Sequence, residues 1–167
     1  MADAEAPRAA AGPVPAGRGA AAIDPRLRGE VVGMIVGLLL QYSAGMVVNL
    51  FVTIPPRHPG RGAADFFAGV AQVVPWAIRH GGALAIHASL GLLLVLNALL
   101  IVGRALRLHR TGLGWLAGVG ALGVVGAGFN GASFLVYDRD QNSLIMALLF
   151  AVALLCYILC LTRLASR

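Results

Sequence analysis

The stretch GGALAIHASLGLLLVLNALLIV, residues 81–102, contains no Asp, Glu, Lys or Arg. Three further uncharged stretches of comparable length lie at 31–53, 113–136 and 143–162. Helices of about 20 residues cross a hydrocarbon core of about 30 Å. Because backbone amides in lipid must be paired within their own segment, we expect each stretch to be helical. The sequence therefore predicts an all-α polytopic membrane protein with four transmembrane helices in an antiparallel bundle.

The overall composition favours a membrane domain over a soluble one. Hydrophobic residues make up 59% of the chain and charged residues only 12%, whereas soluble domains are about 25% charged. All thirteen basic residues are arginines, and most lie beside the uncharged stretches. Lipid headgroups and topology explain the net charge of +6 better than nucleic acid does. We expect the lipid bilayer as a partner and no nucleic acid.

The domain organisation follows from the same pattern. Residues 1–29 are rich in Ala, Pro, Gly and Arg and lack apolar periodicity, which predicts a disordered cytoplasmic tail. Residues 30–165 form the predicted four-helix transmembrane domain.

The distribution of arginines predicts the orientation in the membrane. One side carries nine: Arg8, Arg18, Arg26, Arg28, Arg104, Arg107, Arg110, Arg163 and Arg167. The other side carries four: Arg57, Arg61, Arg79 and Arg139. By the positive-inside rule, both termini are cytoplasmic, and residues 54–80 and 137–142 are extracytoplasmic. We expect a multi-pass protein of the bacterial cytoplasmic membrane.

A short amphipathic helix is predicted at 64–78, in the first extracytoplasmic loop. Its apolar residues recur at helical spacing: Phe66, Phe67, Val70, Val73, Val74 and Ala77. The segment is too short to span the membrane comfortably, so we expect it at the outer interface, with Trp76 at headgroup level.

Small residues form rows along two of the predicted spans. The rows include Gly33, Gly37, Gly114, Gly118, Gly123 and Gly131. Glycines at this spacing let helix backbones approach closely, so we interpret these positions as packing seams. The pattern does not distinguish packing within one chain from a homo-oligomer or a larger membrane complex. Cys156 and Cys160, inside the last span, are expected to be small packing residues as well.

The polar side chains of the spans share one layer in the outer half of the membrane. Asn49, His87 and Asn130 lie about 6, 10 and 9 Å below the outer boundary at 1.5 Å per residue. An unpaired polar group in hydrocarbon costs several kcal/mol, so these groups should converge inside the bundle. The candidate residues for an outward-facing ligand pocket are Asn49, His80, His87, Asn130, Ser133 and Ser143.

His87 has three interpretations. The first is a structural hydrogen bond to Asn49, Asn130 or a backbone carbonyl. The second is a contact to a lipid, a quinone or another small ligand. The third is an axial bond to haem b, with Met46 or Met146 as the second ligand, because no other span contains a histidine.

Chemical motifs of enzymes are absent from the sequence. No span contains a carboxylate for proton-coupled transport, and no phosphate-binding loop, nucleophile elbow or HExxH motif occurs. We therefore expect a non-enzymatic protein with no assigned cofactor, either binding a small or lipid-like ligand near His87 or serving as an accessory subunit. The alternative is an electron-transfer protein with one b-type haem.

Three segments carry a family resemblance: QYSAGMVVNLFVTIP (41–55), HASLGLLLVLN (87–97) and GFNGASF (128–134). They resemble a family of small, mostly actinobacterial, four-helix integral membrane proteins of unknown function. The resemblance covers about residues 30–165 and implies the fold without implying catalytic residues. A fold-level similarity to haem-b four-helix membrane cytochromes rests on the helix number and one intramembrane histidine.

Overall fold

The computed structural model describes residues 25–109 and 111–165, and its secondary structure is entirely helical. The five helices are α1 (Pro25–Phe51), α2 (Phe66–Arg79), α3 (Gly82–Arg107), α4 (Thr111–Tyr137) and α5 (Asp140–Ala165). Four of them, all but α2, are long and apolar enough to cross a membrane. The all-helical fold with four long apolar helices is thus confirmed. Most of the predicted tail, residues 1–24, lies outside the described residues.

The long helices extend beyond the uncharged stretches. α1 begins at Pro25, within the predicted tail, because proline has a preset φ and no N–H to lose at a first helical position. α3 continues to Arg107, five residues past the uncharged stretch. An ion pair joins these added turns, since Arg104 Nε lies 2.9 Å from Glu30 Oε1. Charged residues mark the ends of the apolar stretches, but the helices continue past these residues where they form ion pairs.

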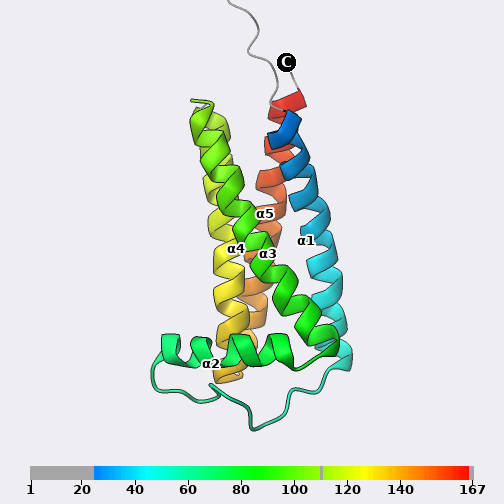
Figure 1. Cartoon of the computed structure of the whole chain (residues 1–167), viewed down its shortest axis with the longest axis vertical. Helices are drawn as coiled ribbons and strands as arrows, with labels where there is room; N and C mark the ends of the chain where they lie inside the picture. The colour runs from blue at the N-terminus through cyan, green and yellow to red at the C-terminus, as the bar shows by residue number, and fades with distance from the viewer. Residues whose placement is uncertain (1–24, 110, 166–167) are drawn as a thin grey trace, which may run out of the picture.

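The four long helices form a ring in which α1 and α4 are diagonal. α1 packs beside α3 and α5, and α4 packs beside the same two helices. The described chain starts and ends at one end of the bundle, here called the termini end (Figure 1). α2 lies across the other end, the α2 end, where it packs on α3 and α4 (Figure 1).

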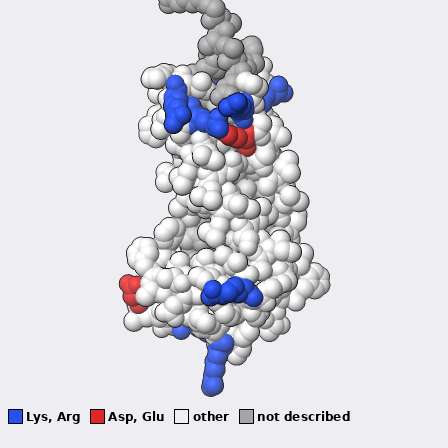
Figure 2. Space-filling view, viewed as in Figure 1, with Lys and Arg blue, Asp and Glu red and all other residues white. Residues whose placement is uncertain are grey.

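Charged side chains gather at the two ends of the molecule. Figure 2 shows this on one face, with a wide uncharged region between the charged groups. Charge–charge contacts within each end are short. The guanidinium of Arg61 lies 2.8 Å from the carboxylate of Asp138, which ties the loop before α2 to the α4–α5 turn.

The helix predicted at 64–78 is present as α2. Its N-cap is Asp65, whose carboxylate accepts a hydrogen bond of 2.7 Å from the amide of Ala68. Phe66 stacks on Phe129 and Tyr137 of α4, with ring centroids 5.7 and 6.4 Å apart. α2 is therefore fixed to the end of the bundle by a cap and by aromatic packing.

The buried core lies mainly in the half of the bundle toward the termini end. It is built from all four long helices: Leu27, Val31, Met34 and Leu38; Leu94, Ala98, Ile101 and Ala105; Leu113, Ala117, Ala121 and Val124; Ala153, Tyr157, Cys160 and Leu164. Cys156 and Cys160 are both buried and free, in keeping with packing residues. Beyond Leu38, α1 contains no buried residue.

Glycines bring some helices into close contact and leave others open. A Cβ on Gly123 would lie 2.9 Å from the carbonyl oxygen of Leu149 on α5. A Cβ on Gly37 would lie 2.6 Å from Leu94. A Cβ on Gly114 would lie 3.4 Å from Leu106, and one on Gly131 would lie 3.3 Å from Met146. Gly33 and Gly118, in contrast, have no such atom within 4 Å.

Candidate functional site

Besides the ion pair of Glu30 and Arg104, a polar contact between uncharged side chains joins Gln41 of α1 to His87 of α3. The Gln41 amide nitrogen donates to the carbonyl oxygen of His87 at 3.1 Å. The same nitrogen lies 3.3 Å from the imidazole Nε2 of His87. Both residues are half-buried. We call these two residues the Gln41–His87 pair.

Two glycines make room for this pair, one on each helix. A Cβ on Gly45 of α1 would lie 3.0 Å from the imidazole Cε1 of His87. A Cβ on Gly91 of α3 would lie 3.1 Å from the amide nitrogen of Gln41. Each polar side chain therefore lies against a glycine on the opposite helix, which larger residues would crowd.

The geometry determines the proton positions of the pair. The amide nitrogen of Gln41 faces a carbonyl, so exchanging it with Oε1 would place two oxygens together. That nitrogen is a donor, so Nε2 of His87 must be the acceptor and Nδ1 carries the hydrogen. His87 Nδ1 and Gln41 Oε1 are both buried without a partner among the described residues. The pair thus presents one unsatisfied donor and one unsatisfied acceptor.

The pair lies where the buried core ends. Leu38 and Leu94 are the last buried residues of α1 and α3 before it, and Gln41 follows Leu38 by three residues. His87 precedes Leu94 by seven residues, on the part of α3 nearer the α2 end. Toward the α2 end, Leu84 of α3 is buried outside the core cluster, and α1 has no buried residue beyond Leu38.

The other predicted pocket residues do not bond to this pair. Asn130 donates to the carbonyl of Gly126 in its own helix at 2.9 Å, and Asn49 is exposed. Ser133 and Ser143 are half-buried, and no hydrogen bond of the described residues joins them to Gln41 or His87. The partner of His87 is Gln41 because the antiparallel contact of α1 and α3 places Gly45, and not Asn49, against the imidazole.

His80 belongs to a different part of the molecule from His87. It is the C-cap of α2, and its ring is tilted against Trp76 with centroids 4.6 Å apart. Gly81 and Gly82, with φ of 85° and 59°, separate α2 from α3. The chain turns at these two glycines, so His80 lies outside α3, the helix that carries His87.

A haem at His87 does not fit the described arrangement. The space beside Gly91 is filled by the Gln41 amide, and the imidazole lies against Gly45 with its Nε2 facing Gln41. Met146 lies on the seam of α4 and α5, against Gly131, and α5 does not contact α3 in the described residues. Met46 of α1 is 39% exposed. No group of three His, Cys, Asp or Glu suited to a metal ion occurs in residues 25–109 and 111–165.

A spacing pattern in the sequence indicates the role of Gln41, although the polarity of its side chain and its depth in the span do not. Gln41 and His87 are each followed four residues later by a glycine, Gly45 and Gly91. On antiparallel helices, this spacing places each polar side chain opposite the glycine of its neighbour.

Comparisons with known protein families, with characterised proteins and with solved structures find no match for this chain.

Proposed function

We propose that this chain is a non-enzymatic, multi-pass protein of the bacterial cytoplasmic membrane that holds a small or lipid-like ligand at the Gln41–His87 pair. The membrane assignment is supported by the four long apolar helices and by the charges at both ends. The split of nine arginines against four favours cytoplasmic termini, so the α2 end faces outward.

One observation carries the ligand proposal: the unsatisfied donor and acceptor on two side chains that touch. A buried polar group without a partner costs about 1–3 kcal/mol. A hydroxyl group can satisfy either atom, because it accepts from Nδ1–H or donates to Oε1. Quinols and hydroxyl-bearing lipids carry such a group on an apolar body suited to the membrane.

The unsatisfied hydroxyl of Tyr157 supports no comparable proposal. It is buried without a partner in the core near the termini end, where apolar side chains surround it. The Gln41–His87 pair differs because it lies at the edge of the core and offers two complementary groups.

Mass spectrometry of molecules that co-purify with the detergent-solubilised protein tests this function. We expect an apolar, hydroxyl-bearing compound in stoichiometric amount with the wild type, and its loss in Gln41→Leu and His87→Leu. Asn49→Leu is the matched control, because Asn49 is an exposed polar residue of the same helix. It should retain the compound.

Equal amounts of every co-purifying compound in all four proteins would contradict the proposal and leave the pair with a packing role. The absorption spectrum of the same samples tests the haem alternative. We expect no Soret band that depends on His87, and a band lost in His87→Leu would overturn our reading of the site.

A further inference from the structure

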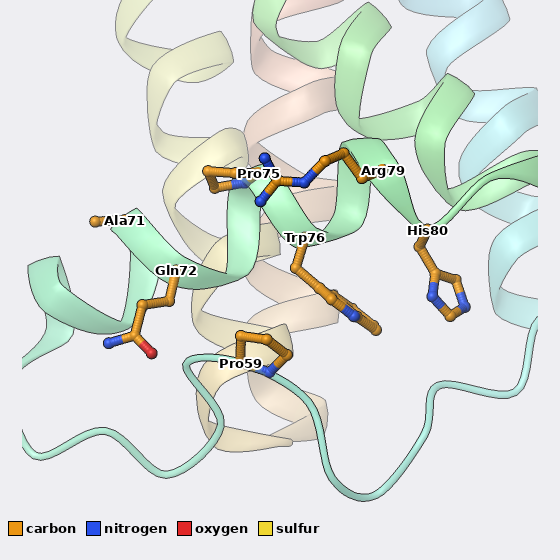
Figure 3. Close-up of a pocket in the computed structure, with 7 residues that line it drawn as sticks. All are labelled: Pro59, Ala71, Gln72, Pro75, Trp76, Arg79 and His80. Atoms are coloured by element: carbon orange, nitrogen blue, oxygen red, sulfur yellow. The ribbon is translucent and has the colours of Figure 1, made fainter.

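A second polar site lies on α2, away from the Gln41–His87 pair. An open hollow with a volume of about 670 Å³ lies along this helix. Its lining includes Gln72, Trp76, Arg79 and His80 of α2 and Pro59 of the preceding loop (Figure 3). Trp76 and His80 point from α2 toward the side where the loop runs, whereas Arg79 lies along the helix (Figure 3).

Two imidazole rings lie against Trp76 in the aromatic part of the hollow, one stacked and one tilted. The His58 ring lies 4.5 Å from the Trp76 ring at an interplanar angle of 16°. The His80 ring lies 4.6 Å from it at 41°. Nδ1 of His58 also lies 3.1 Å from the carbonyl oxygen of Pro59, which connects the loop to this stack. The indole therefore has neighbours that keep it in place beside the hollow.

Arg79 gives the hollow an uncompensated positive charge. It is exposed and has no ion pair among the described residues. Two of the acids at the α2 end are engaged elsewhere: Asp65 caps α2, and Asp138 pairs with Arg61. An anion at this place meets a free guanidinium, with the Gln72 amide on the same lining.

A proline beside the hollow interrupts the hydrogen bonding of α2. Pro75 has no N–H and cannot bond to the carbonyl of Ala71, four residues earlier. Ala71 and Pro75 both line the hollow. A bound group with an anion and a hydroxyl would match both the guanidinium and this carbonyl.

The hollow opens along the flank of α2 and not toward the bundle. Gly69, Val73 and Ala77 are the buried residues of α2. Gln72 precedes Val73 by one residue and so lies about 100° around the helix from it. Because α2 lies across the end of the bundle, its flank faces the layer in which the headgroups of a surrounding bilayer would lie.

From this geometry we propose that the hollow binds the phosphate headgroup of an anionic phospholipid in the leaflet that contains α2. Arg79 holds the phosphate, Gln72 donates to it, and the carbonyl of Ala71 accepts from a headgroup hydroxyl. Trp76 provides an apolar surface at the boundary between headgroup and chain. The site rests on the membrane placement of the bundle but not on any ligand at the Gln41–His87 pair.

Fluorescence of Trp76 in the full chain tests this site. The chain has two tryptophans, and Trp115 is 71% exposed on α4, so Trp115→Phe leaves Trp76 as the only reporter. The protein in detergent is titrated with short-chain phosphatidylglycerol, with phosphatidylcholine of the same chain length, and with inorganic phosphate. We expect a saturable change with phosphatidylglycerol, at a clearly lower concentration than with either of the others.

Arg79→Gln should weaken phosphatidylglycerol binding about fivefold or more, the effect of one arginine at an anionic surface. Arg139→Gln is the matched control, because it removes the same charge from an exposed residue at the same end. It should leave the affinity nearly unchanged. Equal weakening by both variants, or equal binding of phosphatidylcholine, would overturn the proposal. Inorganic phosphate binding as tightly as the lipid would assign the hollow to a soluble anion.

Discussion

Gln41 and His87 show how two glycines create a polar contact between apolar helices. Each side chain lies in the space that the absent side chain of Gly91 or Gly45 leaves. The contact is reciprocal, so a larger residue at either glycine should push one member of the pair away. His87 lies in the part of α3 nearer the α2 end, and the fit of side chains between the helices decides which residue faces it.

At the residue scale, we predict a small coupling energy between the two side chains. In a double-mutant cycle of Gln41→Leu and His87→Leu, we expect about 0.6 kcal/mol and no more than about 1.7 kcal/mol. Gln41→Leu should lower the free energy of unfolding more than His87→Leu does. Gln41→Leu removes both contacts of the amide, whereas in His87→Leu the Gln41 amide still donates to the backbone carbonyl of residue 87. Unfolding free energies in detergent or bicelles measure both quantities.

A cycle of Gln41→Leu with Asn130→Leu is the control. Asn130 bonds within its own helix, so these two changes should be additive. Coupling of the control pair as large as that of Gln41 and His87 would show that the measured energy is not specific to their contact.

Among the helices, the number and approximate positions were predictable from the sequence, whereas their neighbours and ends were not. Long uncharged stretches identify α1, α3, α4 and α5 because burial of apolar surface in lipid needs a minimum length. The extra turns before residue 31 and after residue 102 depend on the pairing of Glu30 with Arg104, which only the folded chain brings together. The break between the helices predicted at 64–78 and 81–102 is present, and Gly81 and Gly82 form it with positive φ.

At the element scale, we predict that two glycines of α4 respond differently to alanine. Gly123→Ala should destabilise the protein by about 1–3 kcal/mol, because the new methyl group meets a backbone oxygen that side-chain rotation cannot move. Gly118→Ala should leave stability unchanged or raise it by up to about 1 kcal/mol through helix propensity. Thermal unfolding of both variants in the same detergent measures the difference.

Both variants replace glycine with alanine, so both increase the helix propensity by the same amount. The difference between their stabilities therefore measures the α4–α5 contact at Gly123. A loss of stability in Gly118→Ala as large as that in Gly123→Ala would contradict this prediction, which is based on the contacts within one chain. It would instead indicate that this open glycine packs against a second copy.

For the whole molecule, we predict that the termini end is cytoplasmic. A cysteine at Arg57, in the loop before α2, should react with an impermeant maleimide on intact cells. A cysteine at His109, between α3 and α4, should react only after the cells are opened. Both positions are exposed, and the native Cys156 and Cys160 are buried and should give little background. The reverse labelling pattern would contradict the orientation derived from the arginines.

The ring order of the helices has a consequence for biogenesis. α1 is synthesised first, yet one of its two neighbours in the ring is α5, which is synthesised last. The side of α1 that packs on α5, the smaller of its two helix contacts, therefore stays uncovered until the ribosome has completed almost the whole chain. During this interval, α1 with α3 forms a partial assembly, and α4 with α5 supplies a late hairpin that closes it. Synthesis that stalls before α5 would leave an incomplete bundle with an uncovered apolar side of α1.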